Sequence, residues 1–181
     1  ADLNGYFGTR GDDLAGNAKL LGINLDSLNH SVDLTSFTLN GYSSIAFDES
    51  LNRGWLGSRT IEDPTRIHAR FFKPGAPSLG LEDYDVASNY DGNLTAGIYN
   101  PSDGKPLFGS SASPATLFRF DADFSGLNAK TLSIGFNHIN TLVRHPINGR
   151  IYAGFGAEEA TTGGVFAIEP NSFDFVYQNP G

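Results

Sequence analysis

The sequence predicts an all-β fold of the barrel or sandwich kind, and three observations lead to this expectation. The 181 residues include 22 glycines and 14 phenylalanines but only 18% charged residues, a composition typical of short strands joined by glycine turns. Apolar and polar residues alternate with a period of two in several stretches, as they do in half-buried strands. No stretch has the pattern of a three-turn helix. We expect one domain over residues 1–181, because this length suffices for one well-packed core.

Charge and cysteine content exclude several classes of protein. The net charge of −8 disfavours a nucleic-acid partner, whose phosphates would need to be neutralised. Without cysteine, the chain has neither disulfides nor thiolate metal sites. No apolar run reaches the length of a transmembrane helix. The chain begins with Ala1, so we expect a mature or trimmed protein that is secreted or attached to the outer membrane at the cell surface.

The N-terminal part of the chain contains several expected strands. Residues 18–25 are apolar enough for a buried strand. Residues 32–39 alternate in two pieces whose phase slips between them, which a β-bulge would correct. Asn40 and Gly41 are a hairpin signal, and a strand is expected over 42–47.

Residues 50–112 are expected to form a loop-rich insertion. They are rich in Pro, Gly, Ser, Asn and Asp, and strands are expected here only over 65–72 and 94–99. Long irregular insertions in compact domains are more often functional than idle. The ligand site is therefore expected to draw on this part of the chain.

The C-terminal part has the cleanest strand pattern. Apolar residues alternate with polar ones from Phe118 onwards, then again over 132–136, 151–155 and 173–177. The core is expected to consist of Phe118, Phe120, Phe124, Leu132, Ile134, Phe136, Ile151, Phe155, Phe166 and Phe173.

One segment near the C-terminus has an echo at the start of the chain. Residues 148–168 read as a strand, a glycine-rich connection with an acidic pair, and a second strand. Residues 4–16 repeat the order Asn-Gly, aromatics, Gly and an acidic pair. The echo predicts that the first strand, near Tyr6, pairs with the last, near Phe175, which would leave no exposed sheet edge.

These segments resemble a known family. Residues 5–16, 118–126 and 152–166 are similar to the C-terminal barrel of transferrin-binding protein B and of its relatives, which include factor-H-binding protein, heparin-binding antigen and hemophilin-type haem-binding proteins. The resemblance implies an antiparallel eight-stranded β-barrel with long inserted loops. It also implies capture of haem, or of a host haem- or iron-carrying protein, and an outer-membrane receptor as a further partner. Residues 50–112 have no counterpart in that family.

Motifs of common enzymes are absent. The sequence has no Gly-x-Ser-x-Gly elbow, phosphate-binding loop, paired-histidine zinc helix or calcium loop. Glu158 and Glu159 are neighbours and would point to opposite faces of a strand. Asp121 and Asp123 share a face and could form a carboxylate pair of a glycosidase, or simply the wet face of a sheet. We therefore expect a protein that is not an enzyme, with a glycan-processing enzyme as a less favoured alternative.

Histidine is rare and supplies the candidate iron ligands. His68 is expected on a strand face with Arg66 and Arg70, which could neutralise haem propionates, and Phe71 and Phe72 could cover the porphyrin. A surface histidine in a basic patch explains the same residues. His138 and His145 are expected to flank a hairpin loop and to meet at one ion or one haem, or else to be exposed loop residues. The candidate metal ligands are His68, His138 and His145.

Aromatic residues complete the expected ligand site. Tyr42 and Trp55, together with other tyrosines of the irregular region, could line a pocket or a protein-binding patch. The sequence thus favours a ligand-capture protein, and the resemblance implies that it serves iron or haem acquisition, with haem as cofactor. The alternative is a carbohydrate-binding β-sandwich or adhesin module in which Trp55 and tyrosines stack on sugars.

Overall fold

The computed structural model describes fifteen strands, and the described residues include no helix. The described residues are 4–8, 20–24, 27, 30–34, 42–58, 67–73, 83–86, 92–123, 125–132, 136–156 and 163–176. Accordingly, no helix that could cross a membrane is found in this part of the chain. The all-β prediction is confirmed.

The strands form four antiparallel sheets, each made of strands consecutive in the sequence. The first sheet contains β1 (Asn4–Gly8), β2 (Leu20–Asn24) and β3 (His30–Leu34). The second contains β4 (Tyr42–Asp48), β5 (Arg53–Ser58), β6 (Ile67–Phe72) and β7 (Asp83–Val86). The third contains β8 (Leu94–Asn100), β9 (Lys105–Ser110), β10 (Thr116–Phe120) and β11 (Leu127–Thr131). The fourth contains β12 (Asn137–Arg144), β13 (Ile151–Gly156), β14 (Gly164–Ile168) and β15 (Phe175–Val176).

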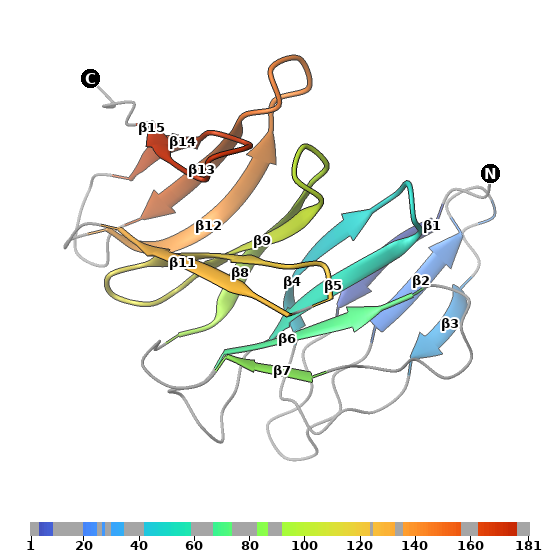
Figure 1. The fold of residues 1–181 in the computed structure, drawn as a ribbon. Coiled ribbons are helices and arrows are strands. Elements are labelled where there is room, and N and C mark those ends of the chain that lie inside the picture. The colour runs from blue at the N-terminus through green and yellow to red at the C-terminus, as the bar shows by residue number, and fades with distance from the viewer. Residues whose placement is uncertain are drawn as a thin grey trace.

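The sheets follow one another in an arc, from the N-terminus on the right of Figure 1 to the C-terminus at the upper left. β4 lies against β8, and β8 lies against β12. We call β4, β8 and β12 the inner strands, since each begins its four-stranded sheet and contacts the first strand of a neighbouring four-stranded sheet. Four-stranded sheets arranged in this way are the blades of a β-propeller. The described sheets form an open arc of such blades.

A structural repeat of one hairpin underlies the second, third and fourth sheets. Each inner strand has a register shift against its partner, at a point where one residue bulges out of the pairing. A glycine of the second strand follows at the same place. The bulged residues are Ser43, Thr95 and Asn140, and the pairs after the shift are Ser44 with Gly57, Ala96 with Gly109, and Thr141 with Gly154.

The third sheet is buried on both faces. One core lies between it and the second sheet and includes Trp55, Phe108, Phe118 and Phe120. The other lies between it and the fourth sheet and includes Leu107, Leu117, Ile139, Ile151, Phe166 and Phe173. Adjacent residues such as Leu117 and Phe118 are therefore both buried, which obscures the period-two pattern of a sheet with one wet face.

The eight-stranded barrel is not confirmed, since the described strands belong to four separate sheets. The predicted pairing of the terminal strands is wrong: β1 pairs with β2, and β15 pairs with β14. Five strands, β5 to β9, fall within residues 50–112, where two were predicted. The three strands that were not predicted are β5, β7 and β9: β7 has only 4 residues, and glycine or proline interrupts the alternation in β5 and β9.

Most of the predicted core residues are buried or half-buried. Phe118, Phe120, Ile151, Phe166 and Phe173 are buried. Leu132, Phe136 and Phe155 are half-buried, and the rings of Phe136 and Phe155 meet edge to face at 4.6 Å. Phe124 and Ile134 lie outside the described residues. The prediction therefore identified real core positions, although it assigned them to one core instead of two.

Candidate functional site

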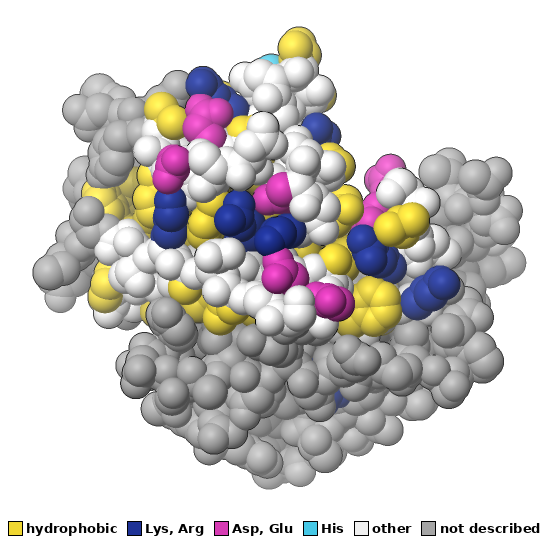
Figure 2. Space-filling view, viewed as in Figure 1, with side chains coloured by type: hydrophobic (Ala, Val, Ile, Leu, Met, Phe, Trp, Pro, Cys, Tyr) yellow, Lys and Arg dark blue, Asp and Glu magenta, His cyan; other side chains and the backbone are white. Residues whose placement is uncertain are grey.

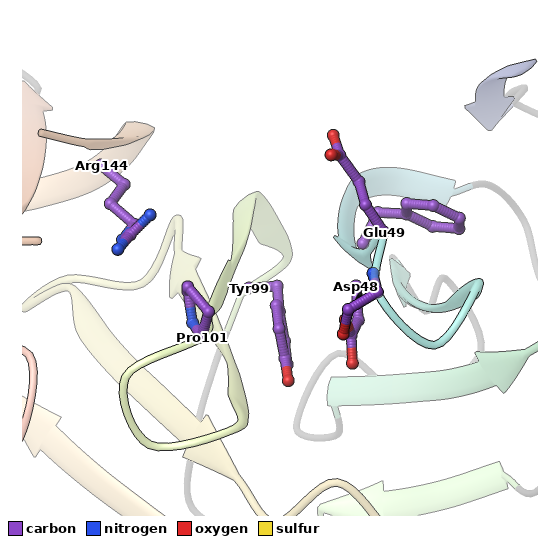
Figure 3. Close-up of a pocket in the computed structure, with 7 residues that line it drawn as sticks. Asp48, Glu49, Tyr99, Pro101 and Arg144 are labelled. Carbon is purple, nitrogen blue, oxygen red and sulfur yellow. Dashed lines mark hydrogen bonds between the residues drawn. The ribbon is translucent and has the colours of Figure 1, made fainter. Parts of the chain in front are cut away.

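A pocket of about 320 Å³ lies where the ends of the three inner strands meet. Figure 3 shows Asp48 and Glu49 on one side, Arg144 on the other, and Tyr99 with Pro101 between them. Its lining residues are Phe47, Asp48, Glu49, Ser50, Tyr99, Pro101 and Arg144. The volume lies within the range of small-molecule sites.

The repeat explains how the pocket is built. In each inner strand, the residue four positions after the bulged residue lines the pocket. These residues are Phe47 in β4, Tyr99 in β8 and Arg144 in β12. The turns that follow these positions add Asp48, Glu49, Ser50 and Pro101. One repeated position thus supplies two aromatic rings and one guanidinium to a common space.

Tyr99 is held in place by the second sheet. Its ring stacks on that of Trp55 with a centroid separation of 5.5 Å and an angle of 8°. The Trp55 indole is fully buried, and its Nε1 donates a hydrogen bond to the carbonyl of Ala122 (3.2 Å). Burial and a hydrogen bond to Asp48 raise the pKa of Tyr99, so its hydroxyl is protonated at neutral pH. The Tyr99 ring is therefore a fixed wall of the pocket.

Asp48 is a buried carboxylate that accepts several hydrogen bonds. Its Oδ1 accepts from the backbone N and Oγ of Ser50 (3.1 and 2.6 Å), and its Oδ2 accepts from Nε of Arg53 (3.2 Å). Burial alone would raise the pKa of Asp48, but the hydrogen bonds from Ser50, Tyr99, Arg53 and Leu51 outweigh it and lower the pKa. An ionised group held in this way is a weak base and orders the turn around it.

Arg144 and Glu49 are less constrained. The Nε of Arg144 is buried and has no hydrogen-bond partner among the described residues. Glu49 lines the pocket and is exposed, and its carboxylate points away from Asp48 and Tyr99 (Figure 3). A guanidinium is always cationic in proteins and recognises carboxylate, carbonyl or phosphate oxygens. The pocket therefore combines an available cation, an accessible carboxylate and an aromatic wall.

Outside the pocket, positively and negatively charged side chains are mixed on the face of the molecule shown in Figure 2. Figure 2 shows Lys and Arg side chains among Asp and Glu side chains over the described part of this face. Ion pairs there include Arg119 with Asp103 (3.3 Å) and Lys130 with Asp174 (2.8 Å). Cations paired in this way are poor anchors for a ligand.

The structure does not bring the residues predicted around His68 together in one ligand site. His68 and Arg70 lie on β6, while Arg66 is outside the described residues and the His68 side chain is not described. Arg70 is buried, and Phe72 is fully buried with its ring centroid 6.0 Å from that of Phe47. Phe71 packs edge to face on Trp55 at 5.8 Å. Phe71 and Phe72 therefore belong to sheet packing and do not line the pocket.

The pocket is not lined by Tyr42, Trp55, His138 or His145 either. Tyr42 and Trp55 are buried. The residues between His138 and His145 form a strand instead of the predicted loop, so the two histidines stand at opposite ends of β12, roughly 20 Å apart. His145 Nδ1 accepts from the backbone N of Ile147 (3.2 Å), which fixes it in the turn. His138 and His145 thus do not meet at one ion.

The acidic pairs do not form a catalytic dyad either. Asp121 pairs with Lys105, and exposed Asp123 accepts from the hydroxyl of Ser125 (2.6 Å) in the turn after β10. Glu158 and Glu159 lie outside the described residues. No group of three or more metal-ligating side chains occurs in the part of the chain that the structure describes.

Sequence reasoning missed the pocket residues Asp48 and Arg144, and included Tyr99 only as one of the tyrosines of the irregular region that could line a pocket. A signal for them exists: the segments 48–57, 100–109 and 145–154 share a polar turn, a basic residue and a glycine at the same spacing. Aligning these three segments would have placed Phe47, Tyr99 and Arg144 at one repeated position.

Comparison with known proteins identifies the fold. No family model and no curated protein sequence matches the chain. A hydrazine synthase of Kuenenia stuttgartiensis is similar in structure, with a TM-score of 0.68, 8% identity, and coverage of 94% of this chain and 47% of that one. A periplasmic gluconolactonase of Pseudomonas aeruginosa has a TM-score of 0.63 and 14% identity, over 91% of this chain and 49% of that one. A candidate 6-phosphogluconolactonase of Bacteroides uniformis has a TM-score of 0.60 and 16% identity, over 96% of this chain and 52% of that one.

These likenesses correct the functional prediction. The chain shares the fold of proteins named as lactonases, and not that of a haem- or iron-capturing barrel, so the capture function is wrong. The expectation that the chain is not an enzyme is overturned by the same two structures. The haem cofactor and the protein partners stay predictions. The chain spans about half the length of the structures it matches, and its fold is that of β-propeller proteins.

Proposed function

We propose that the pocket at the ends of the inner strands binds a sugar lactone and hydrolyses its ring ester. The observation that carries this proposal is that Arg144, whose buried Nε has no hydrogen-bond partner among the described residues, lines a pocket together with the exposed Glu49. Two proteins of similar fold are named as lactonases. That likeness supports the choice of a cyclic ester of a sugar acid over other small polar ligands.

The pocket chemistry suits a hydroxylated ring with one carbonyl. Tyr99 offers an aromatic wall to the apolar side of a sugar ring, and Ser50 offers hydrogen bonds to hydroxyl groups. Arg144 is placed to bind the carbonyl oxygen of the lactone or the carboxylate of the product. Because the pKa of Asp48 is lowered, its carboxylate stays ionised and accepts the hydrogen bonds that order the turn. It is therefore too weak a base to be the catalytic one.

The proposed reaction needs one base and one cation. Glu49 takes a proton from a water molecule as the water oxygen adds to the lactone carbonyl carbon. The Arg144 guanidinium stabilises the negative charge that develops on the carbonyl oxygen. When the intermediate collapses, the bond to the ring oxygen breaks, and that oxygen takes the proton back from Glu49. The product is the open-chain hydroxy acid.

The test is the hydrolysis of glucono-δ-lactone, followed by titration of released acid at constant pH with the spontaneous rate subtracted. Arg144→Gln is expected to lower kcat/KM about 100-fold, because one oxyanion-stabilising group is removed. Glu49→Gln should lower kcat with little change in KM. Leu51→Ala is the matched control, since Leu51 is in the same turn, is 56% exposed and does not line the pocket.

No rate above background in the unmodified chain would end the lactonase proposal. Binding of gluconate by a chain that does not hydrolyse glucono-δ-lactone would also contradict it, because the proposal requires the ester to be cleaved. Equal losses in the Leu51→Ala variant would show that the turn as a whole, and not Arg144 or Glu49, limits the rate.

We further propose a location outside the cytoplasm. The gluconolactonase of similar fold is named as periplasmic, and this chain has no cysteine that an oxidising compartment would act upon. Cell fractionation of the producing organism tests this, and recovery of the chain with cytoplasmic markers would contradict it.

A further inference from the structure

We infer that the outer face of the fourth sheet is a docking surface for the inner strand of a further four-stranded sheet built from the same repeat. This docking face is the one that points away from the third sheet. Its residues are Asn140, Thr141, Val143, Tyr152, Gly154, Val165, Val176 and the buried Ala167.

The repeated glycines show what such a face normally receives. A Cβ atom on Gly57 would lie 2.7 Å from Cβ of Leu94, on the inner strand of the following sheet. A Cβ atom on Gly109 would lie 2.4 Å from Cγ2 of Ile139, again on the following inner strand. In both sheets the glycine makes room for an aliphatic side chain of the next one.

Gly154 occupies the same repeat position but receives no such side chain among the described residues. A Cβ atom there would meet only Thr141 of its own sheet, with Oγ1 at 2.6 Å. Glycine is required at Gly57 and Gly109 because the next inner strand comes close to them. No described residue of another sheet comes close to Gly154 in this way. The geometry points to a vacant place for one aliphatic residue.

The bulged residues provide a second, independent match. Oγ of Ser43 donates to the carbonyl of Leu94 (2.6 Å), and Oγ1 of Thr95 donates to the carbonyl of Ile139 (2.6 Å). In both cases a bulged side chain of one inner strand binds the backbone of the next. Asn140 is the bulged residue of β12, carries an amide donor in place of the hydroxyl and is exposed.

Exposure along the face agrees with these two features. Ala46 and Val143 each stand three residues after the bulged residue of their strand. Ala46 is covered by the third sheet and is 1% exposed, whereas Val143 is 60% exposed. Val165 and Val176 on the same face are 46% and 36% exposed. End repeats of a stack that contact only solvent carry polar outer faces. The valines instead mark a surface made to be covered.

The occupant follows from these contacts. It is an extended strand with an aliphatic side chain above Gly154, whose carbonyl accepts a hydrogen bond from Asn140 and whose sheet covers Val143 and Val165. Leu94 and Ile139 show the residue types that fit. Solved structures of similar fold are about twice as long as this chain, so further sheets of this kind have room in the fold.

The probe is the full chain extended at its C-terminus by a second copy of residues 87–132, which include the third sheet and its Leu94. Hydrogen exchange of the β12 and β13 amides is expected to slow relative to the unextended chain, because the added sheet covers them. Asn140→Ala should reduce this protection up to about tenfold, the effect of one hydrogen bond. Asn140→Thr should restore it, since threonine serves at position 95. Gly154→Val should abolish the protection by filling the vacant place.

Two results would overturn the inference. One is equal exchange in the extended and unextended chains; the other is protection that survives both Gly154→Val and Leu94→Asp in the added copy. Self-association of the unextended chain, seen by light scattering and lost in Gly154→Val, would instead assign the face to a second copy and refute the stated occupant.

A comparison within the unextended chain keeps the inference testable if the added copy does not fold. Gly109→Ala should lower the urea midpoint strongly, because Ile139 fills the space. Gly154→Ala should leave the midpoint nearly unchanged, because only the end of the Thr141 side chain must move. Equal losses in the two variants would show that the place beside Gly154 is not vacant.

Discussion

The indole of Trp55 and the phenol of Tyr99 stack face to face across the boundary between the second and third sheets, with ring centroids 5.5 Å apart. The contact serves both the core and the pocket, because Trp55 is fully buried while Tyr99 lines the pocket. Replacing Tyr99 therefore separates two effects, depending on whether the ring or only the hydroxyl is removed.

Tyr99→Ala is expected to lower the free energy of unfolding by about 2–4 kcal/mol, since the stacked ring is lost and a cavity remains. Tyr99→Phe keeps the ring and removes the hydrogen bond to Asp48, so the expected loss is about 0.5–1.5 kcal/mol. Urea unfolding followed by the fluorescence of the single tryptophan measures both. Equal losses in the two variants would show that the stack contributes nothing.

Asp48 should make stability dependent on pH in the acid range. Its pKa in the folded chain is lower than the ordinary value of 3.8, so the folded state binds the proton less readily than the unfolded state does. The stabilisation is complete above 3.8 and is lost as the pH falls through the lower folded pKa. Asp48→Asn should remove this component and flatten the profile of unfolding free energy against pH below about 4. An unchanged slope in the variant would assign the acid sensitivity to other carboxyl groups.

Phe120→Ala should destabilise the chain by about 3–5 kcal/mol. The Phe120 side chain is fully buried, and its ring contacts that of Phe108 edge to face at 5.9 Å. Leu51→Ala is the control, with an expected change within about 0.5 kcal/mol, because Leu51 is 56% exposed. A loss below about 1 kcal/mol for Phe120→Ala would contradict its place in the core between the second and third sheets.

The spacing of the inner strands should be sensitive to a single methyl group. A Cβ atom on Gly97 would lie 2.7 Å from the backbone oxygen of Ile45, so Gly97→Ala must push β8 away from β4. The expected cost is about 1–3 kcal/mol. At Gly156 the nearest atom would be Nδ2 of Asn140 at 3.6 Å, an ordinary contact, so Gly156→Ala should be tolerated. Thermal unfolding of the two variants makes the comparison, and a tolerated Gly97→Ala would show that β4 and β8 can separate without cost.

The sequence predicted the strand at Phe118 and Phe120 because Arg119 keeps the period-two pattern there, although the sheet is buried on both faces. It failed where the architecture depends on how sheets stack, because hairpin patterns are the same in a barrel, a sandwich and a stack of blades. The echo between residues 4–16 and 148–168 was a real signal, but it was misinterpreted. The motif of Tyr6, Phe7 and Gly8 also occurs as Trp55, Leu56 and Gly57, so it marks a repeated strand and not two ends that pair.

The candidate site was missed for a related reason. Tyr99 and Arg144 are far apart in the sequence and come together only because their inner strands lie side by side. Rare residue types drew attention to His68, His138 and His145, yet rarity does not indicate proximity. Residues at one repeated position would have been the better guide to a shared pocket.

All strand pairings in the described structure join neighbours in the sequence, and no strand of one sheet pairs with a strand of another. Each sheet can therefore form its backbone hydrogen bonds from one short contiguous stretch, such as residues 94–131 for the third sheet. Pairing between sequence neighbours costs little loop-closure entropy and is fast. During synthesis on the ribosome, a sheet can be completed as soon as its last strand emerges, and each finished sheet then offers the next inner strand a surface on which to assemble.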